Sequence, residues 1–301
     1  MNTLPWLQPL HQQLGQLAIR GQLHHALLFT GIDGVGKHYL AAQLAKQLLC
    51  LQPLPAEACG YCKSCLLVQA GHHPDLLQLS GEQSIGVDAV RELSHFMQHA
   101  PQQGGARVVL MPAAERMTEA ASNALLKTLE EPGQNSFLLL QTAQPQQLLA
   151  TILSRCQQWF IPAVAAADSR AWLQQQHSAP ITAGVLDFIQ HYAAGAPLRS
   201  LSLLQSGRAE RLLQLVAQLQ SYLEQQQGLA ELVKQLDAEP EAPLLMHWVI
   251  QQQLTTQPLH SQRLQLFQRL AQWNRDEQLI LGQNKTLSYT ALLLELPRLL
   301  A

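Results

Sequence analysis

Three glycines and a lysine near the N-terminus have the types and spacing of a phosphate-binding loop. Residues 31–37 read G-x-x-x-x-G-K. Glycines let backbone N–H groups turn toward a phosphate, and the start of a following helix adds partial positive charge. The motif predicts a nucleotide site with Gly31, Gly34, Gly36 and Lys37 as its binding residues.

Groups that hydrolysis needs are missing beside this loop. A Ser or Thr hydroxyl should follow Lys37 and bind Mg²⁺, but the residue is His38, whose imidazole is a poor ligand for a hard ion. The expected strand at 108–111 is followed by residues 112–114, Pro-Ala-Ala, where carboxylates for Mg²⁺ and water should stand. Glu115 comes next and is expected to lie away from the phosphates. The sequence predicts a chain that does not hydrolyse ATP. A loop that packs without nucleotide is the favoured interpretation, and nucleotide binding in a weakened pocket is the alternative.

Four of the five cysteines crowd into one segment. Cys59, Cys62 and Cys65 form C-x-x-C-x-x-C, and Cys50 precedes them at the end of an expected helix. Four thiolates at this spacing suit tetrahedral Zn²⁺. An iron–sulfur cluster and free core cysteines are the alternatives. A site closed by four sulfurs has no open coordination position, so a structural role in an inserted module at about 50–65 is predicted.

The elements that must position these residues follow from apolar patterning. Short apolar runs predict strands at 26–29, 76–79, 108–111 and 137–140. Helical patterns run from about Gly36 to Leu49, from Val87 to before Pro101, and from Thr118 as N-cap to before Pro132. This alternation favours a parallel sheet covered on both sides.

Strand patterns end after about residue 162. Leu- and Gln-rich helical segments follow, broken near Pro180, 195–197, Gly207, Pro240 and Pro258. The predicted fold class is therefore α/β then all-α. Three domains are expected: an α/β domain over 1–162, a small helical domain over 163–205 and a larger helical domain over 206–301.

Composition excludes several functions. The formal net charge is −2, which gives no global reason for tight binding to nucleic acid or membrane. The first ten residues lack the pattern of a signal peptide, and no apolar run approaches the roughly 18 residues of a membrane helix. A cytosolic protein is expected. The pairs His24–His25 and His72–His73 lack carboxylates at ligand spacing and are interpreted as packing or surface residues.

Further motifs, taken together, produce a family resemblance. They are His-Pro-Asp at 73–75, Val-Asp-Ala-Val-Arg at 87–91, a segment at 123–132 that ends Leu-Glu-Glu-Pro, and Ser-Arg-Cys at 154–156. With the phosphate loop and the cysteines, they make the chain resemble the bacterial DNA polymerase III clamp-loader subunits of the AAA+ class. The resemblance is specific over about 20–160 and has a weaker echo at Gly282–Lys285.

The family contains ATPase subunits (gamma/tau) with an intact magnesium site. This chain resembles the subunit type with a degenerate site that keeps the Ser-Arg-Cys triplet. The resemblance implies an AAA+ P-loop domain with a Cys₄ zinc module at Cys50, Cys59, Cys62 and Cys65, a small helical lid and a C-terminal helical collar. It implies that Arg155 acts in trans as an arginine finger at a neighbour's ATP site, where a guanidinium can grip phosphate oxygens.

The partners implied by the resemblance are the gamma/tau and delta subunits of a cytoplasmic hetero-oligomer. The sliding clamp and primed DNA are reached through that complex, which belongs to the replisome and DNA polymerase holoenzyme. Arg199 departs from the family pattern, and Thr142 has two possible roles. Arg199 is one place late for the sensing Arg of the ATPase subunits, so that role is not carried over. Thr142 occupies a sensing position, for which a turn role competes.

Two rival functions remain at this point. One is an ATP-hydrolysing clamp-loader subunit. The other is a zinc-dependent nucleic-acid-binding module centred on the cysteines, against which the acidic net charge argues.

Overall fold

The computed structural model describes residues 4–225, 227–255, 268–273, 275–276 and 284–300. Pro258, Gly282 and Gln283 lie outside these residues. The chain divides into two compact units, the first made of 1–173 with 193–199 and the second of 174–192 with 200–301. The three-domain division stays a prediction.

A five-stranded parallel sheet forms the centre of the first unit, in the order β2-β3-β4-β1-β5. Its strands are β1 Ala26–Thr30, β2 Leu76–Gln78, β3 Arg107–Met111, β4 Ser136–Thr142 and β5 Gln157–Phe160. The four predicted strands are confirmed, and β5 is an addition. Among the strands that the structure describes, β5 pairs with β1 alone, and its side chains alternate between half-buried and exposed. It therefore lacks the continuous apolar run of a central strand.

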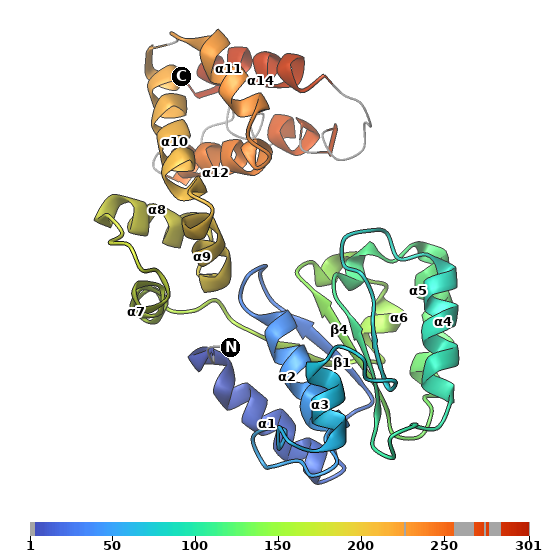
Figure 1. Cartoon of the computed structure of the whole chain (residues 1–301). Helices are drawn as coiled ribbons and strands as arrows, with labels where there is room; N and C mark the ends of the chain where they lie inside the picture. The colour runs from blue at the N-terminus through green and yellow to red at the C-terminus, as the bar shows by residue number, and fades with distance from the viewer. Residues whose placement is uncertain (1–3, 226, 256–267, 274, 277–283, 301) are drawn as a thin grey trace. The chain divides into compact units, whose positions relative to one another are not determined.

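Helices cover both faces of the sheet (Figure 1). On one face lie α1 Gln8–Ile19, α2 Lys37–Leu49 and α3 Lys63–Gln69, and on the other α4 Val87–Gln98, α5 Glu119–Glu130 and α6 Ala150–Leu153. The predicted helices correspond to α2, α4 and α5, and Thr118 caps α5 by accepting a hydrogen bond from Ala121 N at 3.1 Å. The short 3₁₀ helices are η1 Pro5–Leu7, η2 Ala114–Arg116 and η3 Pro145–Gln147. Completely buried strand residues such as Leu28 and Leu138 pack with Leu93 of α4 and Leu125 of α5.

Helix α2 positions the two sites predicted from sequence. Gly36 of the phosphate loop is its N-cap, and Cys50 is its C-cap. Its buried face, which includes Leu40 and Leu44, lies against the sheet, so both ends are fixed relative to the strands.

The second unit is helical, with α8 Ala183–Tyr192, α10 Arg208–Gln225, α11 Leu229–Asp237, α12 Ala242–Thr255 and α14 Lys285–Leu300. Two further helices are α7 Ala166–Gln176 and α9 Pro197–Gln205. Tyr222 of α10 donates a hydrogen bond to Leu293 O of α14 at 3.2 Å, and Trp273 donates one to Ser288 Oγ at 2.7 Å. Of the helices described, none has both the length and the apolarity needed to cross a membrane.

Candidate functional site

The phosphate loop has the backbone shape that its sequence predicts. It joins β1 to α2, and Gly31, Gly34 and Gly36 have φ of 148°, 81° and 108°. Side chains larger than hydrogen are disfavoured at these angles. Gly36 also lies against the side chains of Leu4 and Leu7, and Trp6 Nε1 donates a hydrogen bond to Val35 O at 2.8 Å.

The lysine of the loop is turned back onto the loop itself. Lys37 Nζ donates to Gly31 O at 2.7 Å and to Ile32 O at 3.0 Å, and lies 3.2 Å from Asp33 Oδ1. The residue is only 8% exposed. The lysine ammonium is thus held by the loop's own carbonyl and carboxylate oxygens.

A cavity of about 490 Å³ opens beside the loop. Lys37, His38, Lys46, Glu115 and Gln141 are among its lining residues. His38 occupies the position of the missing hydroxyl. At the end of β3, Pro112 and Ala113 line the cavity where the missing carboxylates should stand.

Glu115 differs from its sequence expectation, because it lines this same cavity. Ala113 adopts a left-handed conformation with φ of 52°, and η2 follows directly. This turn brings Glu115 back beside the loop, and its Oε2 is buried with no hydrogen-bond partner among the described residues. The buried Gln141 Nε2 lacks a described partner as well.

Thr142 and Arg199 have backbone contacts in the structure. Thr142 Oγ1 accepts a hydrogen bond from Gln144 N at 2.9 Å, which is the turn role weighed from the sequence, and Thr142 also lines the cavity. The segment before Arg199 packs on the loop, where Leu198 N donates to Gly34 O at 3.0 Å. A Cβ on Gly34 would lie 2.6 Å from Arg199 N, so this position requires glycine.

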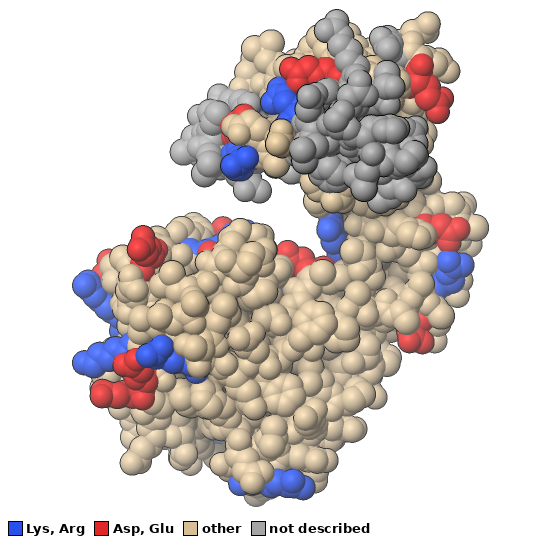
Figure 2. All heavy atoms as spheres, turned by 180° about the vertical axis from the view of Figure 1, so that it is seen from behind, with Lys and Arg blue, Asp and Glu red and all other residues tan. Residues whose placement is uncertain are grey.

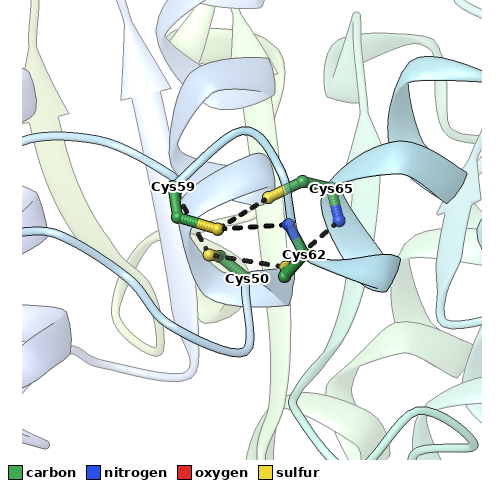
Figure 3. Close-up of side chains that lie close together, drawn as sticks. All are labelled: Cys50, Cys59, Cys62 and Cys65. Atoms are coloured by element: carbon green, nitrogen blue, oxygen red, sulfur yellow. Dashed lines mark hydrogen bonds between the residues drawn. The ribbon is translucent and has the colours of Figure 1, made fainter.

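The four predicted cysteines converge, with their thiols pointing toward one another (Figure 3). The Sγ atoms of Cys50 and Cys62, and those of Cys59 and Cys65, are 3.9 Å apart. Zn–S bonds of about 2.3 Å in a tetrahedron require sulfurs about 3.8 Å apart. The donor set and its spacing therefore fit a four-coordinate metal ion.

Backbone amides support the thiolate form of this cluster. Cys59 N donates to Cys50 Sγ at 3.3 Å, and Cys65 N donates to Cys62 Sγ at 3.5 Å. Burial raises the pKa of Cys62, but the backbone donors of Cys65 and Leu51 outweigh it and lower that pKa to about 6. Burial raises the pKa of Cys65 to about 12. A cation bound by the four sulfurs would favour their thiolate forms.

A buried polar link joins the cysteine segment to the sheet. Ser64 Oγ and His73 Nε2 are 2.6 Å apart, and Ser64 Oγ also donates to Leu49 O. His73 Nδ1 accepts a hydrogen bond from Asp75 N at 3.0 Å, so the ring proton sits on Nε2 and points at Ser64. The ring cannot then take the Ser64 proton, which excludes a serine nucleophile here. His73 was interpreted as packing, and this arrangement agrees.

Arg155 lies in the turn between α6 and β5, at the end of the sheet opposite the phosphate loop. Its guanidinium contacts Glu130 of α5, with Nη2 2.6 Å from Glu130 Oε1. The side chain is 36% exposed, so it is accessible to another molecule. His25, read from sequence as packing, contacts α5 near this point through Nε2 and Leu129 O at 2.9 Å. Cys156 is buried and stands apart from the metal-type cluster.

The parallel sheet, its covering helices and the loop between β1 and α2 define a P-loop-type α/β protein. A DNA polymerase III gamma subunit-related protein from Thermotoga maritima has a similar fold, with a TM-score of 0.52, 17% identity, and coverage of 97% of this chain and 99% of that one. The family described as "DNA polymerase III, delta subunit" matches residues 7–165.

Curated relatives narrow this class. The DNA polymerase III subunit delta′ of Pseudomonas aeruginosa is 42% identical over 81% of this chain and 74% of its own length. That of Escherichia coli K12 is 35% identical over 83% of this chain and 74% of its own length. The E. coli subunit tau is 34% identical over 73% of this chain and 36% of its own length. The chain belongs to the DNA polymerase III delta′ family.

Proposed function

We propose that this chain is the non-hydrolysing delta′-type subunit of a DNA polymerase III clamp loader. In a cytoplasmic complex with gamma/tau and delta subunits, it helps to open the sliding clamp and place it on primed DNA. Arg155 acts as a finger at a neighbour's ATP site. Membership of the delta′ family and the similarity to tau support this assignment.

The phosphate loop carries the non-hydrolysing part of the proposal. Lys37 is hydrogen-bonded to the loop, His38 replaces the Mg²⁺-binding hydroxyl, and Pro112 and Ala113 directly follow β3. A catalytic site for ATP needs an oxygen-rich magnesium shell. We therefore propose that the loop serves as a packed structural element.

Zinc is the proposed metal of Cys50, Cys59, Cys62 and Cys65. The sulfur spacing suits a tetrahedral ion, and a closed four-sulfur site gives it a structural role. The helices after residue 162 are proposed to form a lid over 163–205 and a collar over 206–301 that joins the chain to its partners.

The nucleic-acid-binding rival gains no support from the face of the molecule that Figure 2 shows. On the face in Figure 2, described Lys and Arg side chains are interspersed with Asp and Glu. Binding to DNA by phosphate contacts would favour a continuous basic stripe.

Reconstitution with gamma/tau and delta subunits tests the finger role. Arg155→Ala should lower clamp-stimulated ATPase activity and clamp loading at least tenfold, below the roughly 10³–10⁵ that fingers supply in GTPases, with assembly intact. Arg91→Ala, at an exposed position of α4, is the control. Unchanged activity in the Arg155 variant would remove the finger role.

One observation favours the rival ATPase, namely that Glu115 lines the cavity beside the loop. A turnover assay on the purified chain separates the two functions. The proposal expects no hydrolysis above background. ATP hydrolysis that is abolished by both Lys37→Ala and Glu115→Gln would establish the rival.

A further inference from the structure

The Arg155 side chain is held on one side by its own chain. Glu130 Oε1 lies 2.9 Å from Arg155 Nε and 2.6 Å from Nη2, so one carboxylate oxygen contacts the side edge of the guanidinium. On another side, Nη1 donates to Thr151 O at 3.1 Å and lies 3.5 Å from Ser154 Oγ. These contacts restrict the rotation of a long side chain that would otherwise sample many conformers.

The same contacts leave donor capacity for an outside group. A guanidinium carries five N–H groups, two of them on Nη2. Among the described residues, Nη2 meets one acceptor, Glu130, so its second hydrogen remains available. With a side-chain exposure of 36%, the fork can accept an anion from another molecule while Glu130 still holds it.

Glu130 occupies a place where an acidic residue is otherwise unfavourable. It is the last residue of α5, and the partial negative charge of a helix C-terminus repels carboxylates. The Arg155 guanidinium offsets that repulsion. His25 further holds this helix end through Leu129 O, so Glu130 projects from a fixed point.

We infer that Glu130 is a positioning residue for Arg155, which orients the guanidinium for its contact with an anionic group of a neighbouring subunit. This inference rests on the proposed finger role. Glu130 itself does not touch the reacting groups. It acts by restricting the side-chain conformations of Arg155, so that less conformational entropy is lost when the guanidinium contacts the anion.

The test uses the complete clamp-loader complex and measures the kcat and KM of its ATPase. Glu130→Ala should lower kcat about two- to fivefold, which is the range for a partly exposed ion pair, and leave KM unchanged. Glu130→Gln keeps an acceptor oxygen and should restore part of the loss. Glu131→Ala is the matched control, because it removes the same charge from the next residue, which has no ion pair with Arg155.

A double variant separates positioning from general destabilisation. In an Arg155→Ala background, Glu130→Ala should cause no further loss, because there is no guanidinium left to orient. A fall in kcat for Glu130→Ala of the same size in both backgrounds would overturn the inference, as would a rate equal to or above the native rate. If Arg155→Ala itself has no effect, the finger role fails first, and the inference fails with it.

Discussion

The two ends of helix α2 carry two different sites. The phosphate loop at one end has the expected backbone shape, and the cysteine cluster at the other has a complete set of metal-ligating side chains. At the N-terminus of α2, the phosphate loop has its three glycines with positive φ, but His38 follows Lys37, and Pro112 and Ala113 follow β3. At its C-terminus, Cys50 joins three other thiols at a spacing that suits a metal ion. A loop shape is supported by packing around it and can persist without its chemistry. A four-sulfur site depends on every one of its side chains.

The largest loss of stability should come from a substitution in the cysteine cluster at the C-terminal end of α2. Cys62→Ser should remove the bound metal and cost at least about 3 kcal/mol, or roughly 6–12 °C in Tm, because metal binding contributes to folding free energy. Metal content by mass spectrometry and Tm by calorimetry would measure this. Cys156→Ala, outside the cluster, should keep the metal. A Cys62→Ser protein with its full metal content would contradict the comparison.

A smaller loss of stability should follow when the hydrogen bonds of Ser64, which join the cysteine segment to Leu49 and His73, are removed. Ser64→Ala removes the buried hydroxyl that contacts Leu49 O and His73 Nε2, leaving both without that partner. The free energy of unfolding in urea should fall by about 1–3 kcal/mol. Ser84→Ala, at an exposed serine, should change it by less than about 0.5 kcal/mol. Equal losses in both variants would show that the buried link has no special role.

Acid should weaken this same link. Burial lowers the pKa of His73 below its usual value, with Asp75 opposing the shift. The folded state therefore prefers the neutral ring. Its contribution to stability is complete above the unfolded pKa of about 6.5 and is lost as the pH falls through the folded pKa.

Urea unfolding at pH 7.5 and 5.5 measures this dependence. His73→Gln should flatten it, whereas His72→Gln, at the exposed neighbour, should leave it unchanged. A native chain that is equally stable at both pH values would contradict the prediction. Burial also lowers the pKa of His25, so some dependence should remain in His73→Gln.

The smallest effect is expected at the other end of α2. Lys37→Ala should leave the ATPase activity of the assembled complex within about twofold of native, because the lysine amine serves the loop's own oxygens. Loss of those bonds should cost stability of about 1 kcal/mol. Complex ATPase and Tm would be measured together. A tenfold loss of activity with unchanged Tm would mean that nucleotide at this loop matters to function.

Local sequence patterns were sufficient for much of the first unit. The apolar runs of β1 to β4 and the cap at Thr118 are signals within a few residues, and the structure confirms them. The sequence patterns did not predict strand β5, because Gln157 and Gln158 interrupt its apolar run. An edge strand tolerates such polar residues.

The residue types alone determined that this chain has four clustered thiols, a phosphate loop and no carboxylate immediately after β3. Tertiary structure decided which groups meet across long separations. It placed Glu115 in the cavity, Ser64 on His73, and Glu130 on Arg155. These contacts depend on left-handed turns, helix ends and the order of strands, and a one-dimensional pattern does not encode such distances.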